Sequence, residues 1–205
     1  PSQAHVGFGT GFFDADNDGD LDLLVANGHV YPQIDRAGSG SSYAQPNHLF
    51  TNRGNGTFAL LVSQSGATLG APRVSRSTNI FDYDDDGDMD LFISNLNDRP
   101  ALLRNDMVNG DHWLGLKLIG THSNRDGIGA RVRLVTGRHV QHRDLICGSS
   151  FLASEGRRLH FGLGRHNRVD SLEVRWPSRQ IQYFTDLAVD QYLVIKEGTT
   201  VRTSE

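Results

Sequence analysis

The chain carries two acidic loops with the same internal spacing, and this repetition limits what it can fold into. The loops read DADNDGDLD over residues 14–22 and DYDDDGDMD over residues 82–90, 68 positions apart. Aspartate stands at positions 1, 3, 5, 7 and 9 of each loop, and glycine at position 6. Carboxylates held this close repel one another unless a cation neutralises them. Because strand-like apolar runs flank both loops, the pattern predicts two strand–loop–strand units built around cations.

The ligand chemistry of the loops predicts calcium. Ca²⁺ takes about six to eight oxygen ligands, which such a loop supplies from side chains, a backbone carbonyl and water. Neither loop contains histidine or cysteine, which disfavours zinc. We expect two Ca²⁺ sites, with Asp20 and Asp88 acting through the backbone. The predicted side-chain ligands are Asp14, Asp16, Asp18, Asp22, Asp82, Asp84, Asp86 and Asp90.

Three other interpretations of the loops are an EF-hand, a dockerin-like loop and a solvated acidic turn. An EF-hand requires flanking helices and a bidentate acid at position 12 of the loop. A dockerin-like loop also requires an acid at position 12. Position 12 here is Val25 in the first loop and Ile93 in the second, both inside strand-like runs, which argues against both. The remaining alternative is a solvated acidic turn, which would have to explain two copies with one spacing.

The organisation of the chain predicts an all-β fold. Glycine is frequent, with 23 among 205 residues, and no amphipathic helix of convincing length stands out. Residues 1–108 are expected to form a partial β-propeller, in which HLFTNRGNGTFALLV reads as a hairpin. Residues 109–205 contain short alternating runs and are expected to form a small antiparallel β-sandwich or barrel. In that half, one strand face is predicted to hold Leu114, Leu116 and Leu118, and another to hold Leu172, Val174 and Trp176.

Several smaller features of the sequence have structural rather than functional interpretations. The stretch GFGTG at residues 7–11 lacks the Lys-Ser/Thr ending of a phosphate loop and is expected to be a tight strand connection. SNRDGIGARV at residues 123–132 is expected to be a structured turn. Cys147 is the single cysteine, which excludes an intrachain disulfide, and it is expected to be a small buried residue. Arginine-rich strands lack interleaved aromatic residues, so no nucleic-acid partner is expected. No apolar run is long enough for membrane insertion.

Segments in both halves resemble known families. The order typical of FG-GAP/VCBS repeats in integrin-α-type β-propellers is found in NGHVYP, LFTNRGNGTF and FDYDDDGDMDLFISN. Three segments of the second half resemble the ASPIC/UnbV domain, which follows such repeats in cartilage-acidic-protein-like proteins. They are WLGLKLIGTHSNRDGIGARVRL, RLHFGLG and VDSLEVRWPS. The resemblance implies a secreted, extracellular or cell-surface protein, with a periplasmic location as the alternative. It implies no established reaction, and it implies further upstream blades outside this chain.

The functional expectation is a non-catalytic interaction or adhesion module with no catalytic residues. Its partner would be a protein or glycan that binds at the propeller rim. The long connection at residues 28–46 and its flank form the candidate ligand-contacting region, with His29, Tyr31 and Tyr43 in the connection and His48 beside it as possible contact residues. Two rivals stay open: an enzyme or accessory protein of natural-product biosynthesis, and a glycan-binding domain whose stacking residues would be Tyr31, Tyr43 or Trp113.

Overall fold

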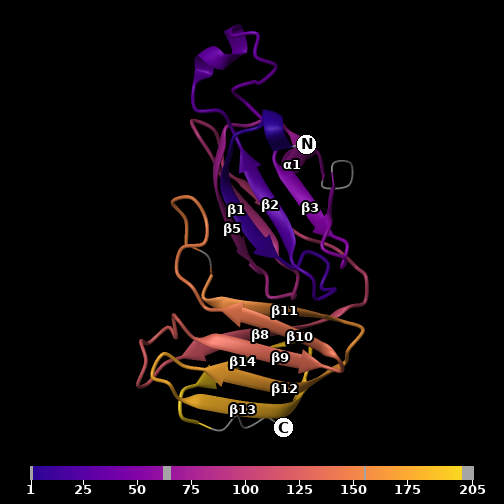
Figure 1. Cartoon of the computed structure of the whole chain (residues 1–205), viewed down its shortest axis with the longest axis vertical. Helices are drawn as coiled ribbons and strands as arrows, with labels where there is room; N and C mark the ends of the chain where they lie inside the picture. The colour runs from indigo at the N-terminus through magenta and orange to yellow at the C-terminus, as the bar shows by residue number, and fades with distance from the viewer. Residues whose placement is uncertain (1, 62–65, 155, 200–205) are drawn as a thin grey trace. The chain divides into compact units, whose positions relative to one another are not determined.

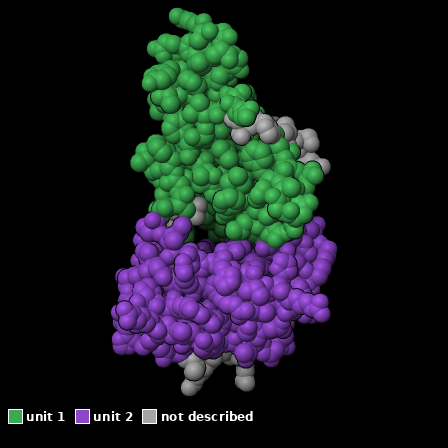
Figure 2. Space-filling view, viewed as in Figure 1, with its two compact units in different colours: residues 1–15, 20–106, 148–156 green, residues 16–19, 107–147, 157–205 purple. Residues whose placement is uncertain are grey.

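The computed structural model describes residues 2–61, 66–154 and 156–199, and its architecture is built almost wholly from strands (Figure 1). This confirms the all-β prediction. The chain divides into two compact units, coloured separately in Figure 2. Unit 1 comprises residues 1–15, 20–106 and 148–156, and unit 2 comprises residues 16–19, 107–147 and 157–205. Among the described residues, no helix has the length and apolar character needed to cross a membrane.

Unit 1 contains two antiparallel sheets. The first has the order β1-β2-β3-β4 and the second the order β5-β6-β7. In the described part of this unit, one five-residue α-helix, α1, follows β4. The elements are η1 Ser2–Ala4, β1 Gly7–Phe13, β2 Asp22–Asn27, η2 Pro32–Arg36, β3 His48–Asn52, β4 Phe58–Leu60, α1 Gly66–Gly70, β5 Ser75–Phe81, β6 Asp90–Asn95 and β7 Ala101–Leu103.

The two sheets of unit 1 repeat each other in register. In the first, Phe13 pairs with Asp22, and in the second, Phe81 pairs with Asp90. Each pairing closes one acidic loop between the two strands. The register also shifts at equivalent places, between Gly7 and Thr10 in β1 and between Ser75 and Thr78 in β5. The repeat seen in the sequence is therefore a repeat of backbone geometry, as the partial-propeller prediction requires.

The stretch GFGTG is part of strand β1, so the prediction of a tight connection was wrong. Strands β1 and β5 lie side by side (Figure 1). A Cβ added to Gly9 would come within 2.8 Å of the Arg76 carbonyl oxygen and the Thr78 nitrogen. Glycine is therefore needed at this position to let the two backbones approach, which is a reason for glycine that a local turn rule does not include.

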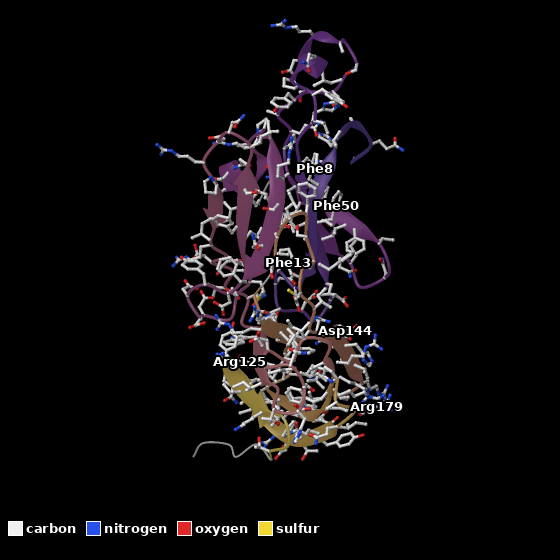
Figure 3. The ribbon with its side chains drawn as sticks, turned by 90° about the vertical axis from the view of Figure 1, so that its left-hand side faces the viewer. Phe8, Phe13, Phe50, Arg125, Asp144 and Arg179 are labelled. Carbon is white, nitrogen blue, oxygen red and sulfur yellow. The ribbon has the colours of Figure 1, made fainter. Side chains whose placement is uncertain are left out.

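Apolar side chains from both sheets form the core of unit 1. Phe13 is 5% exposed and is labelled in Figure 3 together with Phe8 and Phe50. The predicted hairpin is confirmed, because β3 and β4 pair antiparallel and Gly54 and Gly56 adopt positive φ in the turn between them. The buried core consists of Phe13, Leu24, Ala26, Leu49, Leu69, Ile80, Leu91 and Ile93.

Unit 2 is built from two further sheets that enclose one apolar core. Their orders are β10-β9-β12-β13 and β11-β8-β14. Strands β8 and β14 pair in parallel, which differs from the expected all-antiparallel arrangement. The strands are β8 His112–Ile119, β9 Arg131–Thr136, β10 His139–Asp144, β11 Arg158–Gly164, β12 Arg168–Arg175, β13 Ile181–Ala188 and β14 Gln191–Lys196.

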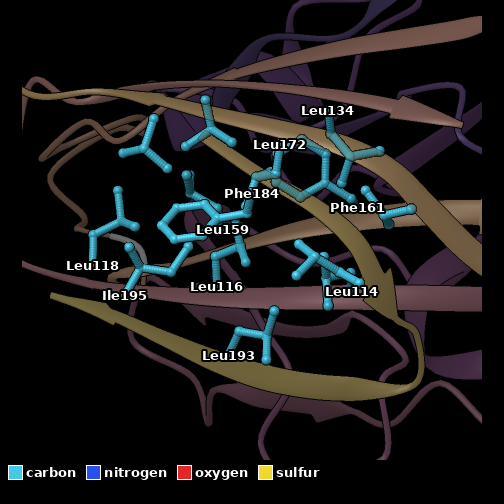
Figure 4. Close-up of a cluster of buried hydrophobic side chains, with 14 of the residues drawn as sticks. Leu114, Leu116, Leu118, Leu134, Leu159, Phe161, Leu172, Phe184, Leu193 and Ile195 are labelled. Carbon is cyan, nitrogen blue, oxygen red and sulfur yellow. The ribbon is translucent and has the colours of Figure 1, made fainter. Parts of the chain in front are cut away.

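The core of unit 2 lies between its two sheets. Figure 4 shows side chains of β8, β11 and β14 pointing toward those of β9, β12 and β13. The predicted faces are confirmed: each named side chain is at most 3% exposed, in the set Leu114, Leu116, Leu118, Leu172, Val174 and Trp176. The predicted turn at residues 123–132 is confirmed in its first part, because the Asn124 side chain bonds both the backbone nitrogen and the carbonyl oxygen of Ile128.

Cys147 is exposed, so the prediction that it is buried was wrong. Strand β10 ends at Asp144, and the alternation of buried and exposed residues does not continue past Leu145. Ile146 and Cys147 both lie on the surface, because this stretch leaves the sheet instead of extending it.

Candidate metal sites

The two acidic loops adopt the same backbone conformation. Each connects paired antiparallel strands, β1 to β2 and β5 to β6. The fourth position is left-handed in both, with φ of 62° at Asn17 and 62° at Asp85. The glycine at the sixth position has φ of 97° at Gly19 and 93° at Gly87, a region that favours glycine. Identical turns at identical positions curl the side chains of alternate residues toward one point.

Each loop gathers three carboxylates. In the first loop, oxygens of Asp14, Asp16 and Asp18 all lie within 4.8 Å of one another. In the second loop, the corresponding oxygens come from Asp82, Asp84 and Asp90. The clusters share the first and third positions of the loop. They differ in the third member, which is the fifth position in the first loop and the ninth in the second.

The remaining predicted ligands lie outside these clusters. Asp22 and Asp86 were predicted as side-chain ligands, and Asp20 and Asp88 as backbone ligands. The Asp86 carboxylate instead accepts a hydrogen bond from the Asp88 nitrogen at 2.9 Å. Six of the eight predicted side-chain ligands are thus brought together, three in each loop.

The ninth position of each loop is a carboxylate that binds backbone amides. Asp22 accepts hydrogen bonds from the nitrogens of Ala15 at 2.9 Å and Asn52 at 2.8 Å. Asp90 accepts them from Tyr83 at 3.0 Å and Asn105 at 2.8 Å. This carboxylate therefore joins the start of its own loop to the end of the strand that pairs with β2 or β6. It holds the cage closed in both loops.

Asn52 and Asn105 were missed by the sequence reasoning. Their side chains also bond into the first loop region, where Asn52 Nδ2 donates to the Leu21 carbonyl at 3.1 Å and Asn105 Nδ2 donates to the Ala15 carbonyl at 2.7 Å. A signal for them exists in the sequence, because LFTN and LLRN both end in asparagine. Asn52 is the last residue of β3, and Asn105 lies shortly after the end of β7.

The residues present fit a hard divalent cation. All clustered donor atoms are carboxylate oxygens, the type that Ca²⁺ and Mg²⁺ prefer. Asp16 Oδ1 is buried and accepts no hydrogen bond, which is costly for a carboxylate unless a cation contacts it. In the second loop, the Asp82 carboxylate accepts hydrogen bonds from the nitrogens of Asp86 at 3.2 Å and Gly87 at 2.8 Å, which fix its orientation.

The pKa of Asp90 reflects this crowding. Burial raises it above its ordinary value, and the nearby charges of Asp84 and Asp86 raise it further, against the lowering effect of its two backbone hydrogen bonds. A bound divalent cation would reverse the balance, because it stabilises the ionised form of every carboxylate around it. Without a cation, the negative charges of this loop are therefore only partly compensated by the protein.

A buried carboxylate in unit 2 is satisfied differently. Glu197 follows β14 and is 2% exposed. Its carboxylate accepts hydrogen bonds from the backbone nitrogens of Thr121, His122 and Ser123 at 2.7–2.8 Å, and from the hydroxyls of Ser123 and Ser178. Burial raises its pKa, but the hydrogen bonds outweigh burial and lower the pKa to about 2. No sequence signal pointed to this residue.

Three of the four candidate ligand-contacting residues lie together in the long connection. The His29 nitrogen donates to the Tyr43 carbonyl at 2.9 Å, and the Tyr31 nitrogen donates to His29 Nδ1 at 3.0 Å. Tyr31 is 66% exposed, so its ring is available on the surface. His48 differs, because it lies in β3, is 6% exposed and has its Nδ1 3.2 Å from Asn27 Nδ2. The structure thus places His48 inside the sheet and not on the loop surface.

Trp113 is not a surface stacking platform. It is 9% exposed and its ring packs 4.9 Å from the ring of Tyr192, measured between centroids. Of the three aromatic residues suggested for glycan stacking, Tyr31 is the one with a largely exposed ring.

Two family models match the chain. Residues 14–93 match the model of the FG-GAP-like repeat, and residues 120–202 match the model named ASPIC and UnbV. The first match spans both acidic loops, and the second covers most of the two-sheet core of unit 2. No curated protein matches the chain.

Proposed function

Because the chain carries an FG-GAP-like repeat followed by an ASPIC/UnbV domain, we propose that it is a calcium-binding interaction module of an extracellular or cell-surface protein. The two acidic loops would each hold one Ca²⁺. The observation that carries this proposal is the pair of three-carboxylate clusters formed at the same positions of two loops with the same backbone turns.

Calcium is favoured over other cations by the donor set. Carboxylate oxygens suit hard cations, and the absence of histidine and cysteine in both loops disfavours zinc. Magnesium requires a stricter octahedral arrangement and keeps more of its water. A loop of alternating aspartates suits Ca²⁺, which is larger than Mg²⁺ and accepts a less regular set of oxygen ligands.

The role proposed for the ion is structural. A bound cation supplies positive charge at the point where the carboxylates converge. The protein connects each loop to its sheet, because Asp22 and Asp90 accept hydrogen bonds from backbone amides at or just after the end of the third strand. Ordering the loop therefore also fixes the ends of the strands that border it, and couples calcium binding to folding.

The interaction surface proposed for a partner is the long connection after β2. Arg76 donates from its guanidinium to the carbonyls of Gly28 at 3.1 Å and His29 at 3.0 Å, which anchors the base of this connection on β5. The exposed Tyr31 offers an aromatic ring for a protein or a glycan partner. We propose no catalytic residue, since the clustered carboxylates are assigned to the cations.

Isothermal titration calorimetry of the metal-stripped chain with CaCl₂ tests this proposal. We expect two bound ions per chain. Asp16→Asn and Asp84→Asn should each remove one site, because each takes a carboxylate from one cluster. Asp144→Asn is the matched control, since this exposed carboxylate belongs to a surface ion pair with Arg131 in unit 2 (Figure 3). Unchanged stoichiometry in the two loop variants would refute the assignment.

A further inference from the structure

Unit 1 contains a pocket of about 230 Å³ at the end of its strands away from the acidic loops. Strand β6 begins next to its loop at Asp90 and ends at Asn95, where the pocket opens. The pocket lies between α1, the start of β3 and the segment from β6 into β7. Its lining residues are Asn47, Thr68, Arg73, Ile93, Asn95, Arg99, Pro100, Ala101 and Leu102.

The pocket has an excess of positive charge. Two guanidinium groups line it, those of Arg73 and Arg99. Arg73 is paired with the nearby carboxylate of Asp98, whose pKa is lowered by that hydrogen bond. The Arg99 side chain makes no hydrogen bond or ion pair with any described residue, and no carboxylate lines the pocket. The single carboxylate of Asp98 interacts electrostatically with both Arg73 and Arg99, so the two guanidinium groups share one negative charge and the wall keeps an excess of one positive charge.

Asn47 also lines the pocket, and one of its side-chain groups is not used within the described part of the chain. Asn47 is 7% exposed, and its Oδ1 accepts a hydrogen bond from the Asn27 nitrogen at 2.9 Å. Its Nδ2 donates to none of the described residues. This amide nitrogen is therefore able to donate to a ligand in the pocket or, in its absence, to water.

The walls of the pocket are held in place by backbone hydrogen bonds. Gln45 and Arg73 exchange a pair of them, at 2.8 and 3.0 Å. The Asn47 nitrogen donates to the Leu69 carbonyl at 3.3 Å, and Asn95 Nδ2 donates to the Arg99 carbonyl at 2.8 Å. These bonds tie the walls of the pocket together before any ligand binds, which reduces the entropic cost of binding.

We propose that this pocket binds an oxyanion, a carboxylate or a phosphate carried by a small polar molecule. Guanidinium groups bind both kinds of anion through paired hydrogen bonds. The amide of Asn47 and the hydroxyl of Thr68 add neutral polar groups, and Ile93, Ala101 and Leu102 add an apolar side. The volume is below the usual range of drug-sized pockets, about 300–1,000 Å³, and suits a single sugar ring or one amino-acid side chain.

The test is a titration of the ¹⁵N-labelled full chain followed by amide chemical shifts, with calcium saturating. The probes are glucuronate, glucose 6-phosphate and neutral glucose, which share a sugar ring and differ in charge. We expect saturable shifts at Asn47, Asn95 and Arg99 with one or both anions and none with glucose. Glucuronate binding alone assigns a carboxylate ligand, and glucose 6-phosphate binding alone assigns a phosphate. Absence of saturable shifts with both anions, or equal shifts with glucose, would overturn the proposal.

Variants locate the binding. Arg99→Gln should weaken anion binding about tenfold or more, because a charged hydrogen bond is lost, and Arg99→Lys should restore part of it. Arg125→Gln is the matched control: this arginine in unit 2 is exposed (Figure 3) and lies outside the pocket. Wild-type affinity in Arg99→Gln would contradict the proposal. No residue of the acidic loops lines the pocket, so the titration with sugars tests anion binding even if the loops prove not to bind calcium.

Discussion

The loop at residues 82–90 and the residue Glu197 both bury carboxylate groups, but they meet the electrostatic cost in different ways. Glu197 is one carboxylate surrounded by five hydrogen-bond donors, and its pKa falls to about 2. The loop brings Asp82, Asp84 and Asp90 together, and the pKa of Asp90 is raised. The charge of Glu197 is compensated by the protein alone, whereas under the proposed function the charges of the loop are compensated by a cation.

This difference teaches where the stability of each unit comes from. Glu197 draws the turn after β8 and the turn after β12 onto the end of β14, through Ser123 and Ser178. Its hydrogen bonds need no ion. The acidic loops connect β1 to β2 and β5 to β6, and under the proposed function their contribution to stability depends on calcium. Four predictions test this contrast, from the largest expected effect to the smallest.

Removal of calcium should have the largest effect, and it should fall on the strands that flank the two acidic loops. Binding that saturates a site at a hundred times its Kd stabilises by about 2.7 kcal/mol, so two sites give about 5 kcal/mol and a fall in Tm of about 10 °C or more. Hydrogen exchange with and without EDTA measures the location. Exchange should accelerate in β1, β2, β5 and β6, and change little in β9 and β12. If exchange accelerated equally in β9 and β12, the prediction that calcium stabilises the strands beside the acidic loops would be contradicted.

Substitution of Glu197 should have the next largest effect, and it should not depend on calcium. In Glu197→Gln an amide group replaces an oxygen that accepts from several donors, and we expect a loss of about 2 kcal/mol, a figure that allows for screening near the surface. Urea unfolding with and without EDTA measures it. The loss should be the same in both conditions, and the control Asp144→Asn should lose less than about 0.5 kcal/mol. A loss that appears only with calcium would contradict this account.

Replacement of the loop glycine should cost less. Gly87 has φ of 93°, where alanine is strained, so Gly87→Ala should destabilise by about 1–2 kcal/mol and weaken calcium binding at the second loop. Calorimetric titration measures the affinity. Gly70→Ala provides the control, because no atom lies within 4 Å of an added Cβ and its φ is not positive. Unchanged affinity in Gly87→Ala would show that the loop tolerates another turn.

Acid should have the smallest effect. The pKa of Glu197 is about 2 in the folded chain against an ordinary value of 4.5, so its stabilisation is complete above pH 4.5 and is lost as the pH falls toward 2. The stability difference between the wild type and Glu197→Gln should therefore narrow by about 1 kcal/mol between neutral pH and about pH 4. Urea unfolding at several pH values measures this, and a difference that widens toward low pH would have the wrong sign.

The sequence predicted the features that repeat. Two copies of one aspartate spacing indicated the loops, and alternation of apolar residues indicated the buried faces of β8 and β12, because both patterns are local. The tight approach of β1 to β5 at Gly9 was not predictable, since the reason for that glycine lies in a strand about 70 positions away. The same holds for the parallel pairing of β8 with β14.

Long-range contacts also explain what was missed in the sites. Glu197 is an isolated glutamate in the sequence, and its role depends on a turn 74 to 76 positions earlier. The difference between the clusters, with Asp18 in one and Asp90 in the other, arises although the two loops have the same spacing. Spacing identifies candidate ligands, and the contacts of each loop decide which of them converge.

The measurement that tests the central claim most directly is anomalous difference density from a crystal grown with calcium. We predict two peaks, one enclosed by Asp14, Asp16 and Asp18 and one by Asp82, Asp84 and Asp90. Well-ordered loops that show only water at both positions in saturating calcium would contradict the account.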